Sequence, residues 1–155
     1  RTTQVWVRDI LELPNMLDYD IRNGRTYMYY KGEPLYPFGH GLSYTAYDYS
    51  DLKVRRCDDG VKVSFNLENV GDRDGEEVVQ VYVRFPGDDA AKRLRGFDRV
   101  AVPHGKTVKV EIHIPEDDLK LWNMSDHAFV MPHGNYRFEV GASSADIRMK
   151  SSLKL

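Results

Sequence analysis

The amino-acid sequence predicts an all-β fold, an antiparallel β-sandwich with an irregular N-terminal arm. From about residue 50 onward, apolar and polar residues alternate with a period of two, as half-buried strands require. Turn-forming residues interrupt this alternation roughly every 8–12 residues, and no long helical period occurs. The chain has 155 residues, of which 41% are hydrophobic, and this fits one domain with a buried core.

Residues 1–45 form the predicted arm, and residues 46–155 form the predicted sandwich. Most of the ten tyrosines lie in the first third of the chain, together with Trp6 and Phe38. Prolines and glycines there interrupt every sustained helical or strand period, and a short helical turn is predicted only at residues 7–13. We expect an ordered segment that extends over a surface against which it packs.

Two runs of alternating apolar residues predict the first strands of the sandwich. A turn at residues 71–75 separates them, and we interpret it as a tight hairpin connection. It resembles a calcium loop only faintly, because it lacks a third ligand position and the closing glutamate. The alternating residues are Val61, Val63, Phe65 and Leu67 in the first run and Val79, Val81, Val83 and Phe85 in the second.

The later strands are predicted in the same way. A strand at Leu94–Val102 ends at the turn formed by residues 103–105, and an alternating strand follows at residues 108–114. After a turn at residues 132–135, two more strands complete the sandwich, one from Tyr136 onward and the last at residues 146–155.

Tyr136 occupies the place of a tyrosine corner. In β-sandwich folds of this kind, such a tyrosine lies near the start of a strand, and its hydroxyl bonds back to the backbone a few residues upstream. Gly134 and Asn135 directly precede Tyr136, and an alternating strand follows it. We therefore expect its hydroxyl to bond to the preceding turn.

No metal site or cofactor site is predicted. Cys57 is the only cysteine, so a multi-cysteine site and an internal disulfide are excluded. No two histidines have the spacing of a helical zinc site, and no cysteine joins them in sequence. The five histidines are His40, His104, His113, His127 and His133.

Charged clusters predict no catalytic group and no nucleic-acid partner. Asp88-Asp89 and Glu116-Asp117-Asp118 fall in predicted turns, where solvated charge is the simplest interpretation. The basic cluster Lys92–Arg95, with Arg99 nearby, fits either an interdomain salt-bridge surface or a solvated edge. The formal charge of −2 argues against binding to nucleic acid or to anionic membranes, and no apolar run approaches the roughly 18 residues of a membrane span.

Two motifs in the arm identify a family resemblance. Residues 24–27 read Gly-Arg-Thr-Tyr, and residues 32–45 read Gly-Glu-Pro-Leu-Tyr-Pro-Phe-Gly-His-Gly-Leu-Ser-Tyr-Thr. Together with residues 69–83, 94–100 and 140–148, which follow in the same order, they resemble the C-terminal region of glycoside hydrolase family 3, the β-glucosidase and β-xylosidase family. The likeness covers nearly the whole chain.

The resemblance implies an immunoglobulin-like, fibronectin type III-like module without catalytic residues. In the family the nucleophile is an aspartate in a Ser-Asp-Trp context within a barrel domain, whereas this chain has Ser-Asp-Leu at residues 50–52 and Ser-Asp-His at residues 125–127. Residues 1–45 correspond to the segment that connects the preceding α/β sandwich domain to the module. His40 departs from the family, which often has an aromatic residue there.

The function implied is a non-catalytic C-terminal module that stabilises a larger enzyme by docking against its barrel and α/β sandwich domains. The parent would hydrolyse terminal non-reducing β-D-glycosides, glucosides or xylosides, and a loop of the module could come near the oligosaccharide substrate at the cleft. We expect a bacterial periplasmic or secreted enzyme, of which this chain, opening at Arg1, is a cut piece. Candidate interdomain docking residues are Trp6, Tyr19, Tyr27, Tyr29, Tyr30, Tyr36, Phe38, His40 and Tyr44.

Two other functions remain alternatives. An independent carbohydrate-binding module would stack polysaccharide on a flat row of exposed rings, but most aromatic residues of the sandwich fall at inward positions. A free-standing enzyme would need a pair of carboxylates in a cleft, and the sequence indicates none.

Overall fold

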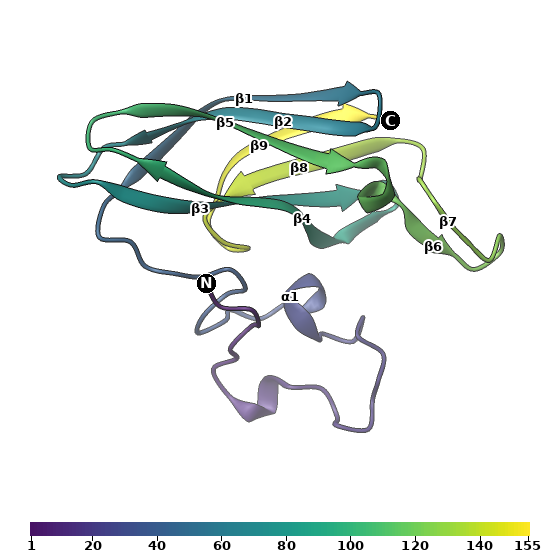
Figure 1. Ribbon diagram of the computed structural model, residues 1–155. Coiled ribbons are helices and arrows are strands. Elements are labelled where there is room, and N and C mark those ends of the chain that lie inside the picture. The colour runs from purple at the N-terminus through teal and green to yellow at the C-terminus, as the bar shows by residue number, and fades with distance from the viewer.

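The chain folds into a two-layered β-sandwich with an irregular arm beneath one layer (Figure 1). The structure, a computed structural model, describes the backbone of residues 1–155 and all side chains except those of residues 89 and 90. All paired strands are antiparallel. One layer has the order β1-β2-β5, and its strands are β1 (Tyr47–Cys57), β2 (Gly60–Asn69) and β5 (Thr107–Pro115). The other has the order β4-β3-β8-β9, and its strands are β4 (Asp88–Val102), β3 (Gly75–Phe85), β8 (Asn135–Gly141) and β9 (Ile147–Lys154).

The core lies between the two layers and is made by the alternating residues. The four apolar residues of β2 and the four of β3 that the sequence singles out are each 0–1% exposed. Phe138 of β8 and Ile114 of β5 are fully buried among them. The period of two therefore places one face of each strand inside, as predicted, and the all-β sandwich is confirmed.

The turn at residues 71–75 is not a hairpin, and this prediction was wrong. It carries the chain from β2 in one layer to β3 in the other. A short loop can join two strands of one sheet or cross the roughly 10 Å between two packed sheets, and its sequence does not distinguish these cases. Its two acidic residues have different partners and do not converge on one site. Asp72 pairs with Arg73, and Asp74 accepts a hydrogen bond from the backbone N–H of His104.

Several element boundaries differ from the sequence prediction. The sequence predicted no strand before Val61, and β1 (Tyr47–Cys57) was therefore missed; it begins at Tyr47, which is 7% exposed because it packs into the core. β4 begins at Asp88 rather than Leu94, so Asp88 lies at the start of a strand instead of in a turn. The side chain of Asp89 lies outside the described residues.

Short elements complete the described chain. The 3₁₀ helix η1 (Ile10–Glu12) falls inside the predicted turn, and helix α1 (Thr26–Tyr29) was not predicted. The acidic run after β5 forms η2 (Glu116–Leu119). A hairpin of two three-residue strands, β6 (Leu121–Asn123) and β7 (Ala128–Val130), follows it. Among the described residues, no helix has the length and apolarity needed to cross a membrane.

The tyrosine corner is present. The Tyr136 hydroxyl donates a hydrogen bond to the carbonyl of Pro132 at 2.7 Å, four residues upstream. The side chain is fully buried, and its ring packs edge-on against Phe85 at 5.5 Å between ring centroids. Burial raises the pKa of Tyr136 from 10.0 to about 12. The corner therefore ties the loop before β8 to the core through a neutral phenol.

Replacing Tyr136 with phenylalanine should lower the free energy of unfolding at neutral pH by about 1 kcal/mol, the typical net contribution of one hydrogen bond. Because the folded-state pKa is raised, the stabilising contribution of the neutral phenol is complete below pH 10.0 and is lost as the pH rises through about 12. The difference between wild type and Tyr136→Phe should therefore shrink above about pH 10, which urea unfolding at two pH values would measure. Tyr44→Phe, at a side chain that is 91% exposed, is the control and should change neither value. A difference that stayed constant with pH would contradict this account.

Candidate docking surface

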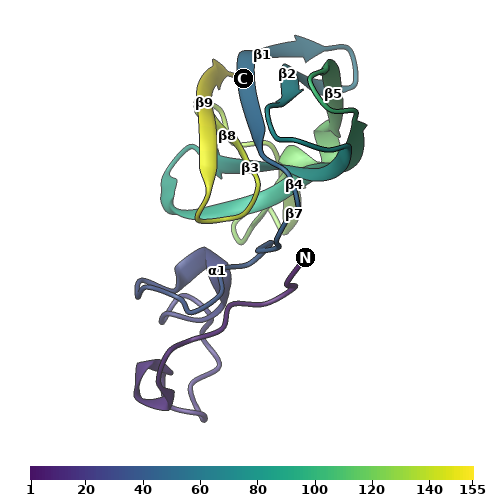
Figure 2. The same ribbon diagram turned by 90° about the vertical axis from the view of Figure 1, so that its left-hand side faces the viewer.

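The arm packs its inner side against the outer face of the four-stranded sheet (Figure 2). The Tyr27 ring stacks on Phe38 at 4.1 Å between centroids and meets the edge of Tyr82 at 6.1 Å. The Tyr27 hydroxyl accepts a hydrogen bond from the backbone N–H of Leu94 in β4 at 2.9 Å. Tyr82 points away from the sandwich core on β3, and it is fully buried because these arm residues cover it.

Gln80, two residues before Tyr82 on β3, links the sheet to the arm. Its amide nitrogen donates to the carbonyl of Gly39 at 3.1 Å and to that of Ala142 at 2.7 Å. Its amide oxygen accepts from the Tyr82 hydroxyl at 2.6 Å. Gly39 has a φ of +80°, and a Cβ there would lie 2.1 Å from the Gln80 oxygen. The close approach of arm and sheet therefore requires glycine at this position.

An ion pair fixes the beginning of the arm. Arg1 Nη2 lies 2.8 Å from Glu77 Oε1, and Arg1 Nη1 donates to the carbonyl of Gly41 at 2.8 Å. Burial raises the pKa of Glu77, and Arg1 and the Tyr49 hydroxyl act in the opposite direction. The arm thus supplies the positive charge that a buried carboxylate needs.

The middle of the arm is held by contacts within the arm itself. Trp6 and Tyr36 form an isolated β-bridge, and their rings meet edge-on at 6.5 Å between centroids. The Tyr36 ring also contacts His40 at 5.4 Å. Trp6 is 51% exposed and Tyr36 is 45% exposed, and with His40 and Leu42 they line an open hollow of about 450 Å³.

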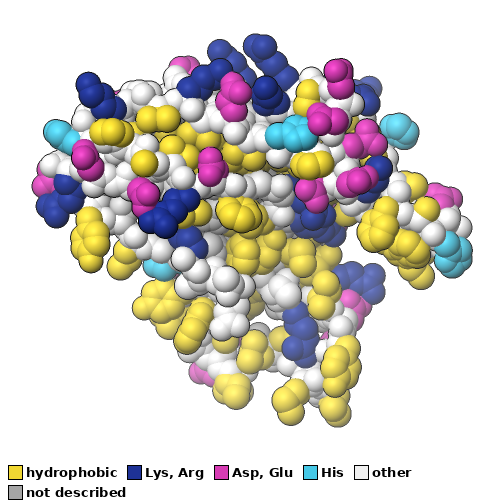
Figure 3. Space-filling view, in the orientation of Figure 1, with side chains coloured by type: hydrophobic (Ala, Val, Ile, Leu, Met, Phe, Trp, Pro, Cys, Tyr) yellow, Lys and Arg dark blue, Asp and Glu magenta, His cyan; other side chains and the backbone are white. Residues whose placement is uncertain are grey.

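An outer loop, defined as residues 7–25, carries the largest group of exposed apolar side chains on the arm. Figure 3 shows hydrophobic side chains gathered over the arm, below the charged surface of the sandwich. The sequence interpretation singled out aromatic rings and missed the aliphatic ones, although apolar residues without any period were a signal. The exposed apolar side chains of the outer loop are Ile10 (77% exposed), Leu11 (88%), Leu13 (51%), Met16 (84%), Leu17 (79%), Tyr19 (86%) and Ile21 (45%).

The predicted docking residues fall into three groups. Tyr27 and Phe38 pack against the module's own sheet. Trp6, Tyr36 and His40 lie together on the arm, and half-buried Tyr30 donates a hydrogen bond to the carboxylate of Glu12. Tyr29 is half-buried, whereas Tyr19 and Tyr44 are exposed.

The β6–β7 hairpin presents a second exposed aromatic pair that the sequence did not indicate. It projects beyond the end of the sandwich (Figure 1). Trp122 is 49% exposed and Phe129 is 67% exposed, and their rings lie 5.3 Å apart at an interplanar angle of 72°. Rings this far from coplanar do not form the flat row that polysaccharide stacking requires.

The basic cluster is largely engaged inside the module. Lys92 Nζ lies 3.8 Å from Glu139, and Arg93 Nη2 lies 2.9 Å from Asp88. Their side chains are 16% and 19% exposed. The interpretation as a solvated edge was therefore wrong for Lys92 and Arg93, because the arm covers the adjoining face, whereas Arg99 is 71% exposed on this outer strand of the sheet.

One expectation about the histidines was wrong. The sequence places Cys57 far from every histidine and predicted no site that combines them, but in the fold Cys57 and His113 lie in one cluster with Asp59. Strands β1 and β5 both flank β2, so residues far apart in sequence meet at one end of this sheet.

Comparisons with known proteins agree with this architecture. A fibronectin type III-like domain matches residues 77–144. A xylan 1,4-beta-xylosidase from Xylanibacter ruminicola is 34% identical over 143 residues, which are 90% of this chain and 16% of that protein. Beta-glucosidase 3B from Thermotoga neapolitana superposes with a TM-score of 0.79 at 36% identity, over 88% of this chain and 20% of that one. Beta-D-glucoside glucohydrolase from Trichoderma reesei gives a TM-score of 0.88 at 26% identity, over 99% and 26%.

The sheet order and the tyrosine corner, together with the matching domain, define a fibronectin type III-like module. The chain belongs to glycoside hydrolase family 3, as the C-terminal module with its preceding segment. It spans about a sixth to a quarter of the length of the relatives described above, 16–26%.

Proposed function

We propose that this module is a non-catalytic part of a longer glycoside hydrolase, in which the arm docks against the catalytic domains. The observation that carries the proposal is the two-sided arm. Its inner side is anchored to the sheet through Tyr27, Phe38 and Gly39, and its outer loop leaves a group of large apolar side chains exposed. Large apolar patches are uncommon on free-standing domains and mark interaction sites.

The partner is the body of the same polypeptide, the barrel and α/β sandwich domains. The chain matches a small share of each relative's length, so most of such a protein lies outside it. Burying exposed leucines against that body would contribute roughly 1.5–3 kcal/mol each before ordering costs. Because the inner side is already ordered, that cost is reduced, and the arm would hold the module in one position.

The activity of the complete enzyme is the hydrolysis of terminal non-reducing β-D-glycosides, glucosides or xylosides. The names of the relatives support this, since they include both beta-glucosidases and a xylan 1,4-beta-xylosidase. The module itself supplies position and stability rather than chemistry. In the complete enzyme, a loop of the module would lie close to the oligosaccharide substrate bound in the catalytic cleft.

Substitutions in the outer loop test the docking. In the isolated chain, Leu11→Asp and Leu17→Asp should change the free energy of unfolding by less than about 0.5 kcal/mol, because both side chains are already exposed. In the complete gene product, the same substitutions should lower the melting temperature of the enzyme by a few degrees, because an aspartate would be buried at the interface. Differential scanning calorimetry of both forms measures this.

Met124→Asp is the matched control, since this side chain is 74% exposed on the β6–β7 turn, away from the arm. It should be neutral in both forms. The docking proposal is rejected if Leu11→Asp destabilises the isolated chain as much as the complete enzyme. It is also rejected if Leu11→Asp leaves the stability of both forms unchanged.

A further inference from the structure

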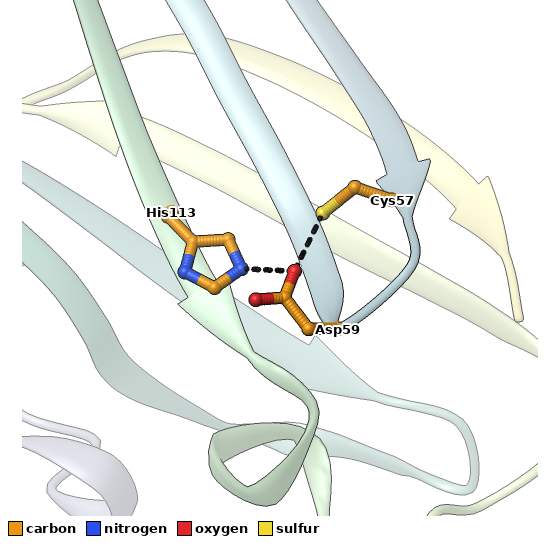
Figure 4. A group of neighbouring side chains, drawn as sticks. All are labelled: Cys57, Asp59 and His113. Atoms are coloured by element: carbon orange, nitrogen blue, oxygen red, sulfur yellow. Dashed lines mark hydrogen bonds and ion pairs between the residues drawn. The ribbon is translucent and has the colours of Figure 1, made fainter.

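Three side chains of metal-binding types meet at one end of the three-stranded sheet (Figure 4). Cys57 ends β1, Asp59 lies in the turn between β1 and β2, and His113 lies on β5. Asp59 Oδ1 lies 2.9 Å from His113 Nε2 and 3.6 Å from Cys57 Sγ. All three ligand atoms lie within 4.8 Å of one another.

The backbone holds these residues in place. Cys57 pairs with Gly60 across the β1–β2 hairpin, and Gly60 pairs in turn with Pro115 of β5. The carbonyl of Asp59 accepts a hydrogen bond from the N–H of Glu116 at 2.9 Å, which ties the turn to the end of β5. Gly60 has a φ of +154° and no side chain, so nothing projects from that position between the two outer strands.

We propose that Cys57, Asp59 and His113 form a binding site for a divalent transition-metal ion of the Zn²⁺ class. Thiolate, imidazole and carboxylate are the ligands that Zn²⁺ takes in proteins. A thiolate and a carboxylate supply two negative charges, which balance the ion. Lys62, which pairs opposite His113, forms an ion pair with Glu111 at 3.6 Å.

Two of the three separations between the ligand atoms fit a tetrahedral ion with small movements, and the third, from Cys57 Sγ to His113 Nε2, lies within 4.8 Å. Ordinary zinc bond lengths place a sulfur and an oxygen ligand about 3.5 Å apart, and a nitrogen and an oxygen ligand about 3.3 Å apart. The sulfur–oxygen separation here is 3.6 Å, and the nitrogen–oxygen separation of 2.9 Å must open by a few tenths of an ångström. The Asp59 side chain is 78% exposed and is free to make that change. Solvent reaches the cluster and supplies the fourth ligand.

Binding would connect three segments of the sheet, because the three ligands come from β1, from the β1–β2 turn and from β5. The site is independent of the docking surface, because it lies on the three-stranded sheet and the arm packs on the other sheet.

Titration of the chain with Co²⁺, a coloured substitute for Zn²⁺, tests the site. A thiolate-to-cobalt charge-transfer band should appear in the near ultraviolet and disappear when Zn²⁺ is added. Zn²⁺ should also slow the alkylation of Cys57 by iodoacetamide, and mass spectrometry measures this without ambiguity because the chain has 1 cysteine. Cys57→Ser should abolish the band, and His113→Ala and Asp59→Asn should each weaken binding by more than the roughly 10- to 100-fold that the loss of an outer-shell partner costs, because each removes a direct ligand.

Asp58→Asn and His133→Ala are the matched controls. Asp58→Asn removes the same charge from the same turn, and His133→Ala removes an exposed histidine outside the cluster. Both should bind Co²⁺ as the unaltered chain does. The proposal is overturned if no charge-transfer band forms and Zn²⁺ leaves the alkylation rate unchanged, or if Asp58→Asn weakens binding as much as Asp59→Asn does.

Discussion

Asn69→Ala is expected to lower the free energy of unfolding by about 3–5 kcal/mol, because several buried polar groups would lose their partners at once. The Asn69 side-chain amide donates to the carbonyls of Arg73 at 2.8 Å and Val102 at 2.9 Å. Its oxygen accepts from the N–H of Gly71 at 3.1 Å and from the Thr45 hydroxyl at 2.7 Å. Asn69 is fully buried where the chain crosses from one sheet to the other.

Urea unfolding followed by circular dichroism would measure this loss. Asn66→Ala is the matched control on the same strand, since Asn66 bonds to Asp51 at the exposed surface and should cost less than about 1 kcal/mol. Asn69→Asp keeps the acceptor oxygens but removes both donated bonds, so it should also be strongly destabilising at neutral pH. If Asn69→Ala cost no more than Asn66→Ala, the crossing between the sheets would be held by its backbone alone.

Tyr82→Ala should have a comparable effect on stability and should also release the arm. Truncating a fully buried aromatic ring costs about 3–5 kcal/mol, and this ring is covered by Tyr27 of the arm. Its hydroxyl also orients the Gln80 side chain, which bonds to Gly39. We therefore expect lower stability in urea and faster proteolytic cleavage within residues 1–45.

Two further variants show whether the effect of Tyr82→Ala comes from the loss of this buried ring. Tyr82→Phe keeps the ring and loses one hydrogen bond, so it should cost about 1 kcal/mol and leave the arm protected from protease. Phe97→Ala removes a ring that is 69% exposed on β4 and should change stability by less than about 0.5 kcal/mol. Cleavage of the arm at an unchanged rate in Tyr82→Ala would mean that the aromatic contact does not anchor it.

The fold could be predicted from the sequence because burial on one face of a strand leaves a period of two. That pattern placed β2 and β5 within a residue or two and found β3, although β3 starts four residues before the first alternating residue, Val79. It did not place the start of β4, where the charged side chains of Lys92 and Arg93 are paired with Glu139 and Asp88 and are only 16% and 19% exposed. A strand with both faces buried loses the alternation on which the prediction depends.

The candidate docking surface was predictable in part. An aromatic-rich segment with many prolines indicated an arm that packs against a surface, and Tyr27 and Phe38 do pack on the sheet. Which rings turn inward and which stay exposed depends on the folded path of the chain. Trp6 and Tyr36 meet across 30 residues because a β-bridge joins their backbones, and no local pattern marks that contact.

The sequence by itself determined the fold class, the sites of most turns and the family of this module, because strand alternation and linear motifs are local properties of the chain. The tertiary structure alone decided which strands share a sheet, that residues 71–75 cross between layers, and that Cys57 meets His113. The physical reason is that sheet order and register join residues far apart in the chain, and a local pattern carries no information about which partner a strand will find.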